Sequence, residues 1–366
     1  MSHILFVNHT RELHGAELVL LQSLEAAREA GHRVTVVLPS HVPDSGLDAE
    51  VSKRADKVLH LPYRPAGDSL LRTVVVRWYN TYACGRLARY IRHEKVDIVY
   101  SNTMVTTVGV LAARRCGVTH VWHLHELPHA MFGWRDSLKR MYRRWLRYRR
   151  NKIVYISKYQ RSAWEDTLGM RLQGEIIYNP IRRIEVQPIK HEGVRIGYLG
   201  AFAERKNIPL LVGAYEHLRE RRSDVELWLC GAKNAAEVER IRALSKQENA
   251  GIEVMMATDD VASFFAQIDI FVLPSFAETM PLVVMEALQA HVCVLQTTQS
   301  GMAELLQHKK DCLFFPPTRQ DLLEEQLKSC MNKAYRDALA TNGQKHVEEL
   351  MSNQKYNVSL QKVLRL

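Results

Sequence analysis

The sequence predicts an α/β protein made of two consecutive doubly wound domains, each built on a parallel sheet. Short runs of β-branched and aromatic residues alternate with longer segments of helical periodicity, and this alternation is typical of βαβ units. The 366 residues are 46% hydrophobic and 25% charged, which suffices for two domains of roughly 150 to 200 residues each. A polar stretch from Asn179-Pro180 to Gly193 divides the series of strands and is the expected linker.

The expected strands follow one another in the same rhythm in both halves. Those of the first half are expected at 3–8, 33–38, 57–61, 97–100, 119–124, 152–156 and 175–178. Those of the second half are expected at 195–200, 226–231, 252–255, 270–274, 292–296 and 312–316. The tail from Asp321 to Leu366 has helical periodicity without a strand signal, so we expect it to cap the second domain and cross back to the first. We therefore assign residues 1–185 and 186–345 to the two domains and 346–366 to a C-terminal helix.

Composition excludes several classes of protein. No apolar run approaches the roughly 18 residues that span a bilayer, and the N-terminal segment is expected to be a strand rather than a signal peptide. The six cysteines are scattered without CxxC spacing, which favours buried thiols over structural zinc. We expect a protein of the reducing cytoplasm, either soluble or peripheral at the cytoplasmic face of a membrane.

The net charge of +10 is distributed unevenly. Residues 1–186 contain 29 Lys and Arg against 17 Asp and Glu, a net charge of +12, whereas residues 187–366 carry −2. A basic half raises the local concentration of anions, which would be phosphates, nucleic acid or a membrane surface. Nucleic acid is the least favoured of these because no known nucleic-acid-binding module is present.

The strongest group of candidate residues directly follows the expected strand at 270–274. Pro281 suits the first turn of a helix, so Glu278 is expected in the preceding loop and Glu286 more than a turn inside. Free backbone N–H groups at that helix start form a site for a diphosphate. A buried Glu286 needs a polar partner, and a ribose diol would serve. Taken alone, two glutamates are more often solvated.

Two further segments follow strands. Adjacent Arg205 and Lys206 come after the glycine turn at Gly200 and are suited to neutralise a diphosphate leaving group, although solvated surface cations would look the same. In the first half, residues 11–17 contain a single glycine, Gly15, between His14 and Glu17, which makes a dinucleotide site unlikely in comparison with a plain turn.

Histidines and cations complete the candidates in the first half. Strand alternation places His123 and His125 on one face, but no third ligand at suitable spacing indicates a metal, and satisfied core histidines are the alternative. The basic stretch 139–150 interleaves Tyr142, Trp145 and Tyr148 with cations. Such a segment suits an anionic membrane interface, and a solvated helix face is the alternative. The cations and tryptophan assigned to this membrane patch are Lys139, Arg140, Arg143, Arg144, Arg147 and Trp145.

The block SFAETMPLVVMEAL at 275–288, followed by a strand and by SGMAEL at 300–305, resembles the donor-binding segment of family four retaining glycosyltransferases. The resemblance extends over essentially the whole chain and implies the GT-B fold, two Rossmann-like domains facing across a cleft. It implies that Glu278, with Thr279, Met280 and Pro281, lies against the donor sugar and diphosphate and that Glu286 binds the ribose. The loop from Gly301 to Glu304 would close behind the donor.

The other segments match the family with departures. Gly200 and Lys206 match, but Ala201 stands where an arginine is expected, so Arg205 is the candidate to replace it. Gly15 and Glu17 match a phosphate-approaching and acceptor-approaching loop in which His14 replaces a glycine. The resemblance implies that His125 contacts the donor sugar near the reacting carbon, with Glu126 on the acceptor side. His291 stands where the family usually has a small residue, which implies only a local change in packing.

The resemblance implies an enzyme that moves a hexosyl or N-acetylhexosaminyl group from a nucleotide-diphosphate sugar to a glycan or lipid-linked acceptor. Such an enzyme would serve cell-surface polysaccharide or glycolipid assembly, with retention and without a cofactor or metal. Two alternatives remain open at this point. One is a GT-B-like sugar-nucleotide isomerase or phosphorylase, and the other is a nonenzymatic subunit that binds anions or nucleic acid.

Overall fold

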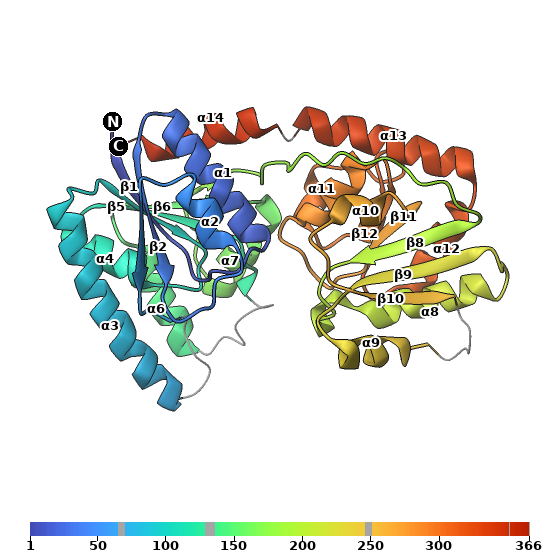
Figure 1. Ribbon diagram of the computed structural model, residues 1–366, viewed down its shortest axis with the longest axis horizontal. Coiled ribbons are helices and arrows are strands. Elements are labelled where there is room, and N and C mark those ends of the chain that lie inside the picture. Colours follow the sequence, from blue (N-terminus) through green and yellow to red (C-terminus); the bar gives the residue numbers. More distant parts are fainter. Residues whose placement is uncertain (65–69, 129–135, 246–250, 351, 366) are drawn as a thin grey trace. The chain divides into compact units, whose positions relative to one another are not determined.

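The computed structural model describes residues 1–64, 70–128, 136–245, 251–350 and 352–365. The chain divides into two compact units, the first formed by Met1–Pro180 with Asn353–Leu366 and the second by Ile181–Ser352. The sequence places the corresponding divisions at 185/186 and 345/346. Both units are α/β structures with a parallel sheet, as expected (Figure 1).

The sheet of the first unit has the strand order β3-β2-β1-β4-β5-β6-β7, and all its pairs are parallel. The strands are β1 (His3–Val7), β2 (Arg33–Pro39), β3 (Lys57–Leu61), β4 (Ile98–Asn102), β5 (Thr119–Leu124), β6 (Asn151–Tyr155) and β7 (Glu175–Ile176). Because β4 pairs with β1 and not with β3, the direction of winding reverses between β1 and β4. In open α/β sheets, ligands bind at the carboxyl ends of the strands beside such a reversal.

Helices pack on both faces of this sheet. They are α1 (Gly15–Glu29), α2 (Leu47–Ser52), α3 (Leu70–His93), α4 (Val108–Cys116), α6 (Asp136–Leu146), α7 (Lys158–Leu168) and α14 (Asn353–Leu364). Alternation along the strands sends Phe6 and Tyr100 into one core cluster with residues of α1 and α14, and Leu5 and Val99 into another with residues of α3 and α4. This period of two is the reason that β-branched runs predicted the strands correctly.

The last helix returns to the first unit. In Figure 1, α14 lies beside α1, and Tyr356 and Leu360 are buried in the same cluster as Leu20 and Leu24. The hydroxyl groups of Tyr356 and Ser23 are 2.6 Å apart. Burial of each such apolar side chain contributes about 1.5 to 3 kcal/mol, so α14 is an integral part of the first unit. The expected return of the C-terminal helix is confirmed.

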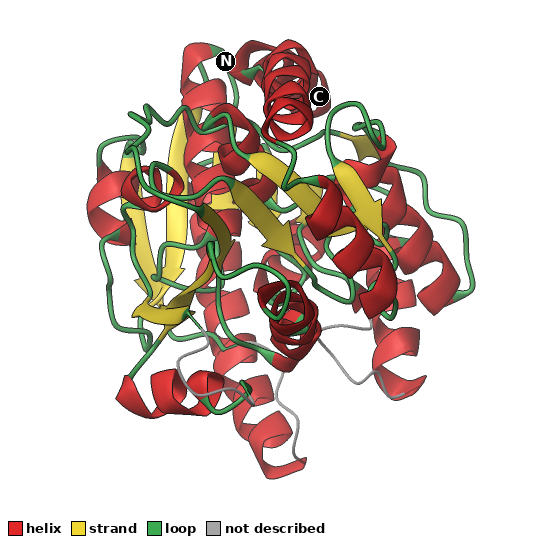
Figure 2. Ribbon diagram, turned by 90° about the vertical axis from the view of Figure 1, so that its right-hand side faces the viewer, coloured by secondary structure: helices red, strands yellow, loops and turns green. Residues whose placement is uncertain are grey.

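The sheet of the second unit has the order β10-β9-β8-β11-β12-β13, again parallel. Its strands are β8 (Val194–Leu199), β9 (Val225–Ala232), β10 (Ile252–Met256), β11 (Ile270–Leu273), β12 (Cys293–Thr297) and β13 (Leu313–Phe315). Its helices are η1 (Glu204–Lys206), α8 (Ile208–Arg219), α9 (Ala235–Arg242), α10 (Val261–Phe265), α11 (Leu282–Gln289), η2 (Gly301–Glu304), α12 (Gln320–Ser329) and α13 (Lys333–Leu350). Figure 2 shows helices on both faces of the strands.

The reversal of winding in this sheet lies between β8 and β11. Strand β8 ends at a close approach of two glycines, Gly200 and Gly231, both with φ of +148°. A Cβ atom at Gly231 would collide with the carbonyl oxygen of Gly200. Glycine is therefore required here, since it alone adopts this backbone and leaves room for the neighbouring chain.

Candidate active site

The loop after β8 is held against the loop after β11. Asn207 adopts the left-handed conformation with φ of +55°, and its Nδ2 donates to the carbonyl oxygens of Pro274 at 3.2 Å and Pro317 at 2.9 Å. The backbone N–H of Phe276 donates to the carbonyl oxygen of Arg205 at 2.9 Å. These bonds bring the short helix η1, which carries Arg205 and Lys206, to the segment that carries Glu278.

Lys206 and Glu278 form a buried ion pair. The Nζ of Lys206 lies 2.5 Å from Oε1 of Glu278, and their side chains are 13% and 10% exposed. Burial lowers the pKa of Lys206, while the charge of Glu278 opposes that effect. Arg205 is more open, with its side chain 47% exposed and its Nη1 3.7 Å from the same oxygen. The three groups carry two positive charges and one negative charge, so an anion beside them would meet a net positive site.

The backbone of Glu278 is fixed on its other side by the loop after β12. Its N–H donates to the carbonyl oxygen of Gln299 at 2.9 Å, and its carbonyl oxygen accepts from Gly301 at 3.2 Å. The side chain of Ser300 caps η2 by accepting from the N–H of Met302 at 3.2 Å. Gly301 is buried and Glu304 is half-buried. The structure thus brings Glu278 next to the segment 301–304, whereas Thr279 is half-buried and Met280 and Pro281 are buried on the way to α11.

Glu286 is a buried carboxyl in the middle of α11. The helix begins after its cap residue Pro281, and Glu286 is only 6% exposed. Burial raises its pKa, and the positive charge of Arg182 offsets part of that increase. Among the residues that the structure describes, no side-chain hydrogen bond or ion pair is formed by Glu286. A carboxyl held in this way has unused capacity to accept hydrogen bonds from a ligand's hydroxyl groups.

In the first unit, polar side chains at the ends of three adjacent strands form one hydrogen-bonded chain. Asn102, at the end of β4, donates from Nδ2 to Oδ1 of Asn8 at 3.0 Å, directly after β1. Asn8 donates in turn to Oε1 of Glu17 in α1 at 3.1 Å. The Nε2 of His125, which follows β5, lies 3.0 Å from Oδ1 of Asn102. Because that oxygen is an acceptor, Nε2 of His125 carries the hydrogen and donates it.

Burial keeps this histidine neutral. It lowers the pKa of His125 to about 3, with a smaller repulsion from His9, and it lowers the pKa of His9 itself to about 4. His123 is also buried, and its ring contacts that of His125 in a tilted arrangement, with ring centres 4.2 Å apart and planes at 45°. Its Nδ1 lies 2.6 Å from the hydroxyl of Tyr100. The contact between the two rings confirms the expectation that His123 and His125 share a face.

Glu126 is a buried carboxyl that holds the backbone around it. Burial raises its pKa to about 7, and backbone N–H groups that bond to it oppose the increase. Its oxygens accept from the N–H of Met104 at 3.2 Å and from the N–H of His125 at 3.1 Å. These bonds fix the backbone of Met104 and His125 around the carboxyl, and the acceptor-side role of Glu126 stays a prediction.

The three candidate residues around the start of α1 differ in their exposure to solvent. His14 precedes the helix and is exposed, with its Nε2 3.0 Å from Oε2 of Glu12. Gly15, the first residue of α1, is also exposed, whereas Glu17 is 1% exposed and points into the polar chain described above. Burial raises the pKa of Glu17. Of the three residues assigned to the acceptor-side loop, His14 and Gly15 are therefore accessible to solvent and Glu17 is not.

The membrane patch requires a correction. Trp145 and Tyr142 are 9% and 2% exposed and belong to a core cluster with Trp122 and Trp164, so they do not face an interface. The hydroxyl of Tyr142 donates to the carbonyl oxygen of Met104 at 3.0 Å. Arg143 is half-buried and donates from Nε to the carbonyl oxygen of Leu168 at 2.5 Å. Arg140, Arg144 and Arg147 are exposed and Lys139 is half-buried, so a basic surface without the aromatic side chains remains.

Three asparagines with positioning roles escaped the sequence analysis. Asn8 directly follows the apolar strand β1, Asn102 is the last residue of the apolar strand β4, and Asn207 directly precedes α8. A polar residue at the carboxyl end of a buried strand is a usable signal, because such ends meet at one edge of a parallel sheet. In the described part of the chain there is no cluster of three or more His, Cys, Asp or Glu side chains that could hold a metal ion. None of the described helices is long and apolar enough to cross a bilayer.

Two protein families match consecutive parts of the chain, and together they cover nearly all of it. Residues 13–183 match Glycosyltransferase Family 4, and residues 182–346 match Glycosyl transferases group 1. The chain belongs to the group 1 glycosyltransferases. The expected family and the expected GT-B fold are thereby confirmed.

Individual relatives of this glycosyltransferase are distant. Mannosylfructose-phosphate synthase of Agrobacterium fabrum is 21% identical over 283 residues, which cover 65% of this chain and 62% of that protein. Capsular polysaccharide biosynthesis glycosyltransferase CapM of Staphylococcus aureus is 22% identical over 43% of this chain and 42% of its own. The chain therefore matches less than two thirds of the length of either curated relative. Among solved structures, Anabaena HepE in complex with UDP-glucose has a TM-score of 0.81 at 17% identity, with 100% of this chain and 99% of HepE covered.

Proposed function

We propose that this glycosyltransferase moves a hexosyl or N-acetylhexosaminyl group from a nucleotide-diphosphate sugar to a glycan or lipid-linked acceptor, with retention of the anomeric configuration. The acceptor would belong to the assembly of a cell-surface polysaccharide or glycolipid. The observation that carries the proposal is the Lys206–Glu278 pair beside Arg205, which lies at the reversal of winding between β8 and β11. The UDP-glucose bound by HepE and the polysaccharide role in the name of CapM support the same substrate class.

In this proposal the second unit binds the donor. Arg205 and Lys206 neutralise the diphosphate, whose charge grows as the glycosyl bond breaks. Glu278 holds Lys206 in place and lies beside the donor sugar, and Glu286 accepts hydrogen bonds from the ribose diol. Charge stabilisation by preorganised groups of this kind is commonly the largest contribution to catalysis.

In this proposal the first unit carries His125 and binds the acceptor. None of the side chains assigned to the site is an activated nucleophile, so we propose a front-face reaction. A bond forms between the acceptor oxygen and the anomeric carbon while the bond from that carbon to the diphosphate oxygen breaks. The proton of the acceptor hydroxyl passes to the leaving diphosphate. Positioning of the two substrates then provides much of the rate.

We also propose that transfer requires no divalent cation and that the exposed cations of α6 attach the enzyme to an anionic membrane surface. Cationic side chains and helix N-termini would replace the metal. Activity that disappears with a chelator and returns with manganese or magnesium would refute the first of these statements.

The direct test is a screen of sugar nucleotides for stabilisation of the purified protein, followed by turnover with the best donor. Ligand at about 100 times its dissociation constant adds roughly 2.7 kcal/mol of stability, which a thermal-shift measurement detects. NMR of the product reports its anomeric configuration. Release of nucleoside diphosphate with a retained glycoside as product supports the proposal. An isomerised sugar nucleotide, a sugar phosphate or an inverted glycoside would contradict it.

A further inference from the structure

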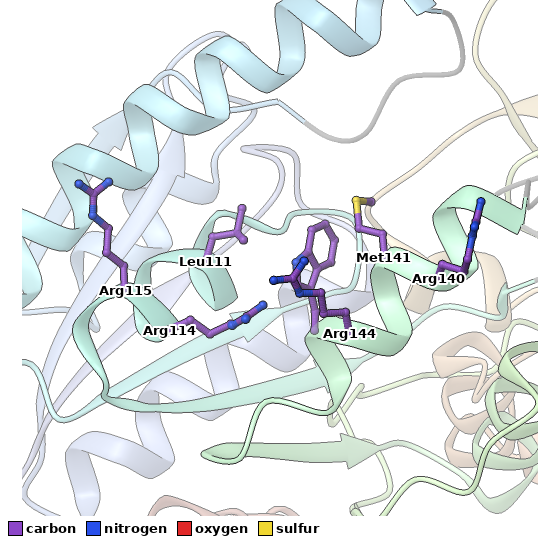
Figure 3. A pocket seen from close by; sticks show the side chains of 7 residues that line it. Leu111, Arg114, Arg115, Arg140, Met141 and Arg144 are labelled. Atoms are coloured by element: carbon purple, nitrogen blue, oxygen red, sulfur yellow. The ribbon is translucent and has the colours of Figure 1, made fainter.

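Helices α4 and α6 of the first unit enclose a basic hollow of about 800 Å³. It is lined by Leu111, Arg114, Arg115, Arg140, Met141, Arg144 and Trp145 (Figure 3). Leu111 and Arg115 lie one turn apart on α4, and Arg140 and Arg144 lie one turn apart on α6, so the helical spacing directs each set to one face. The hollow is thus a consequence of two helices that pack on the same face of the sheet.

The charges of the hollow are not compensated. Among the described residues, none of its four guanidinium groups is paired with a carboxylate. Other arginines of the first unit are paired, such as Arg11 with Asp48 at 2.6 Å. In Figure 3 the side chains of Arg114 and Arg144 reach toward each other from the two helices. Like charges gathered without a counter-charge favour an anion between them.

The floor of the hollow is apolar. Leu111 and Met141 pack on the core cluster that contains Trp145. The guanidinium of Arg114 is steadied by the ring of Tyr148, whose centre is 5.9 Å away. The lining therefore combines a fork of donors that matches phosphate oxygens with a surface that accepts the carbon backbone attached to them.

The hollow is separate from the site assigned above. Arg114 and Arg115 are in the last turn of α4. In a parallel αβ unit the helix runs back against the strands, so its last turn lies at the end of the sheet opposite the carboxyl ends. Asn102 and His125 lie at those carboxyl ends. Changes in the hollow should consequently leave donor and acceptor groups in place.

We propose that this hollow is a discrete site for the phosphate group of an anionic phospholipid. A membrane is favoured over a small soluble anion because the hollow is open to solvent and the exposed cations Arg147, Arg149 and Arg150 directly follow α6. The first half of the chain also carries the charge that draws it to an anionic surface. The site deepens the proposed membrane attachment and rests on it, while it does not depend on glycosyl transfer.

The test compares two double variants of the full chain. Arg114→Ala with Arg144→Ala removes two cations from the hollow. Arg86→Ala with Arg89→Ala removes the same charge from exposed positions of the neighbouring helix α3, which do not line it. Binding is measured by co-sedimentation with vesicles of phosphatidylcholine mixed with phosphatidylglycerol, and with vesicles of phosphatidylcholine mixed with oleate at equal surface charge.

The proposal expects the hollow variant to bind phosphatidylglycerol vesicles at least about tenfold more weakly than wild type, since each basic residue near an anionic surface contributes appreciably to attachment. The α3 variant should lose clearly less, and wild type should prefer phosphatidylglycerol to oleate. Equal losses in both variants, or equal binding to both vesicles, would overturn the phosphate site while keeping membrane attachment. Absence of wild-type binding to any vesicle would overturn both. Binding of inorganic phosphate without vesicle binding would show a site for a soluble anion and overturn the lipid assignment.

Discussion

The Nζ of Lys206 lies 2.5 Å from Oε1 of Glu278, although the two residues are 72 positions apart in the chain. The bond joins the segments that follow β8 and β11, the strands at which the winding of the second sheet reverses. Burial lowers the pKa of Lys206, and the bond to Glu278 opposes this effect because it favours the charged lysine. The pair is therefore both a structural link and the centre of a positive site.

Replacement of Lys206 by alanine should slow turnover by about a hundredfold, which is typical for loss of one group that stabilises developing charge. The variant also leaves Glu278 with only the half-exposed Arg205 as a partner, so the site loses its net positive charge and attracts a diphosphate less strongly. Steady-state kinetics with the donor identified by the thermal-shift screen measure the effect. Lys328→Ala, which removes an exposed lysine from the last turn of α12, should retain wild-type kinetics.

Arg205→Ala tests whether Arg205 takes the role of the arginine that the family has at the position of Ala201. Its half-exposed guanidinium lies 3.7 Å from Glu278, and this one contact leaves further N–H donors for a diphosphate. We expect turnover to fall on the order of a hundredfold with little change in the free energy of unfolding, because an exposed ion pair contributes about 0 to 1 kcal/mol. Full activity would mean that the role is absent or is filled by another residue.

Glu286→Gln should weaken donor binding without destabilising the free protein. A hydrogen bond to a charged group contributes about 1.5 to 3 kcal/mol, so the dissociation constant of the sugar nucleotide should rise by roughly ten- to a hundredfold. The free protein should be at least as stable as wild type, because the raised pKa of Glu286 shows that its ionised form is disfavoured by burial. Calorimetric titration and urea unfolding measure the two quantities. An unchanged dissociation constant, with Glu239→Gln as the exposed control, would contradict the assignment to the ribose.

The strands and the position of the glutamates could be predicted because they depend on local patterns. β-Branched runs marked each strand, and a proline after a strand marked the start of α11, which fixed Glu278 in the loop and Glu286 in the helix. The link between Asn8 and Asn102 could not be predicted in this way, since it spans 94 residues and depends on which strands become neighbours. Sequence periodicity does not specify strand order.

The aromatic residues of α6 show a different kind of error. Tyr142, Trp145 and Leu146 are spaced by three and four residues, which is the pattern of a stripe that faces a core. The neighbouring cations favoured an interfacial interpretation, and the structure shows that the stripe packs against β5 and α7 instead. The spacing was the better guide because a helix separates its faces by period and not by composition.

The buried carboxyl of Glu126 predicts a specific dependence of stability on pH. Its pKa is 4.5 in the unfolded chain and about 7 in the folded protein, so the folded state holds the proton between these values and the unfolded state has lost it. The stability that Glu126 contributes is therefore complete below about pH 4.5 and is lost as the pH rises to about 7. The free energy of unfolding of wild type minus that of Glu126→Gln should fall across this window, by up to about 3 kcal/mol, and then stay level. Urea unfolding at a series of pH values measures it, and parallel curves would show that Glu126 is ionised throughout.

Asn102→Asp should raise the pKa of His125 from its value of about 3. The structure places Oδ1 of Asn102 3.0 Å from Nε2 of His125, and a carboxylate there would attract the imidazolium that burial disfavours. Asn151→Asp is a matched control, because Oδ1 of Asn151 lies 2.6 Å from Nδ1 of His120, so this change should raise the pKa of His120 and leave His125 alone. NMR titration of the labelled rings reports both groups in the free protein, and the near-ultraviolet circular dichroism of each variant establishes that it is folded.

If neutral His125 contacts the donor sugar, the activity of Asn102→Asp should decline on acidification with the raised pKa of His125, which wild type does not show. A His125 titration that is unchanged in folded Asn102→Asp, alongside a shifted His120 in the control, would mean that Asn102 does not set the protonation of this histidine.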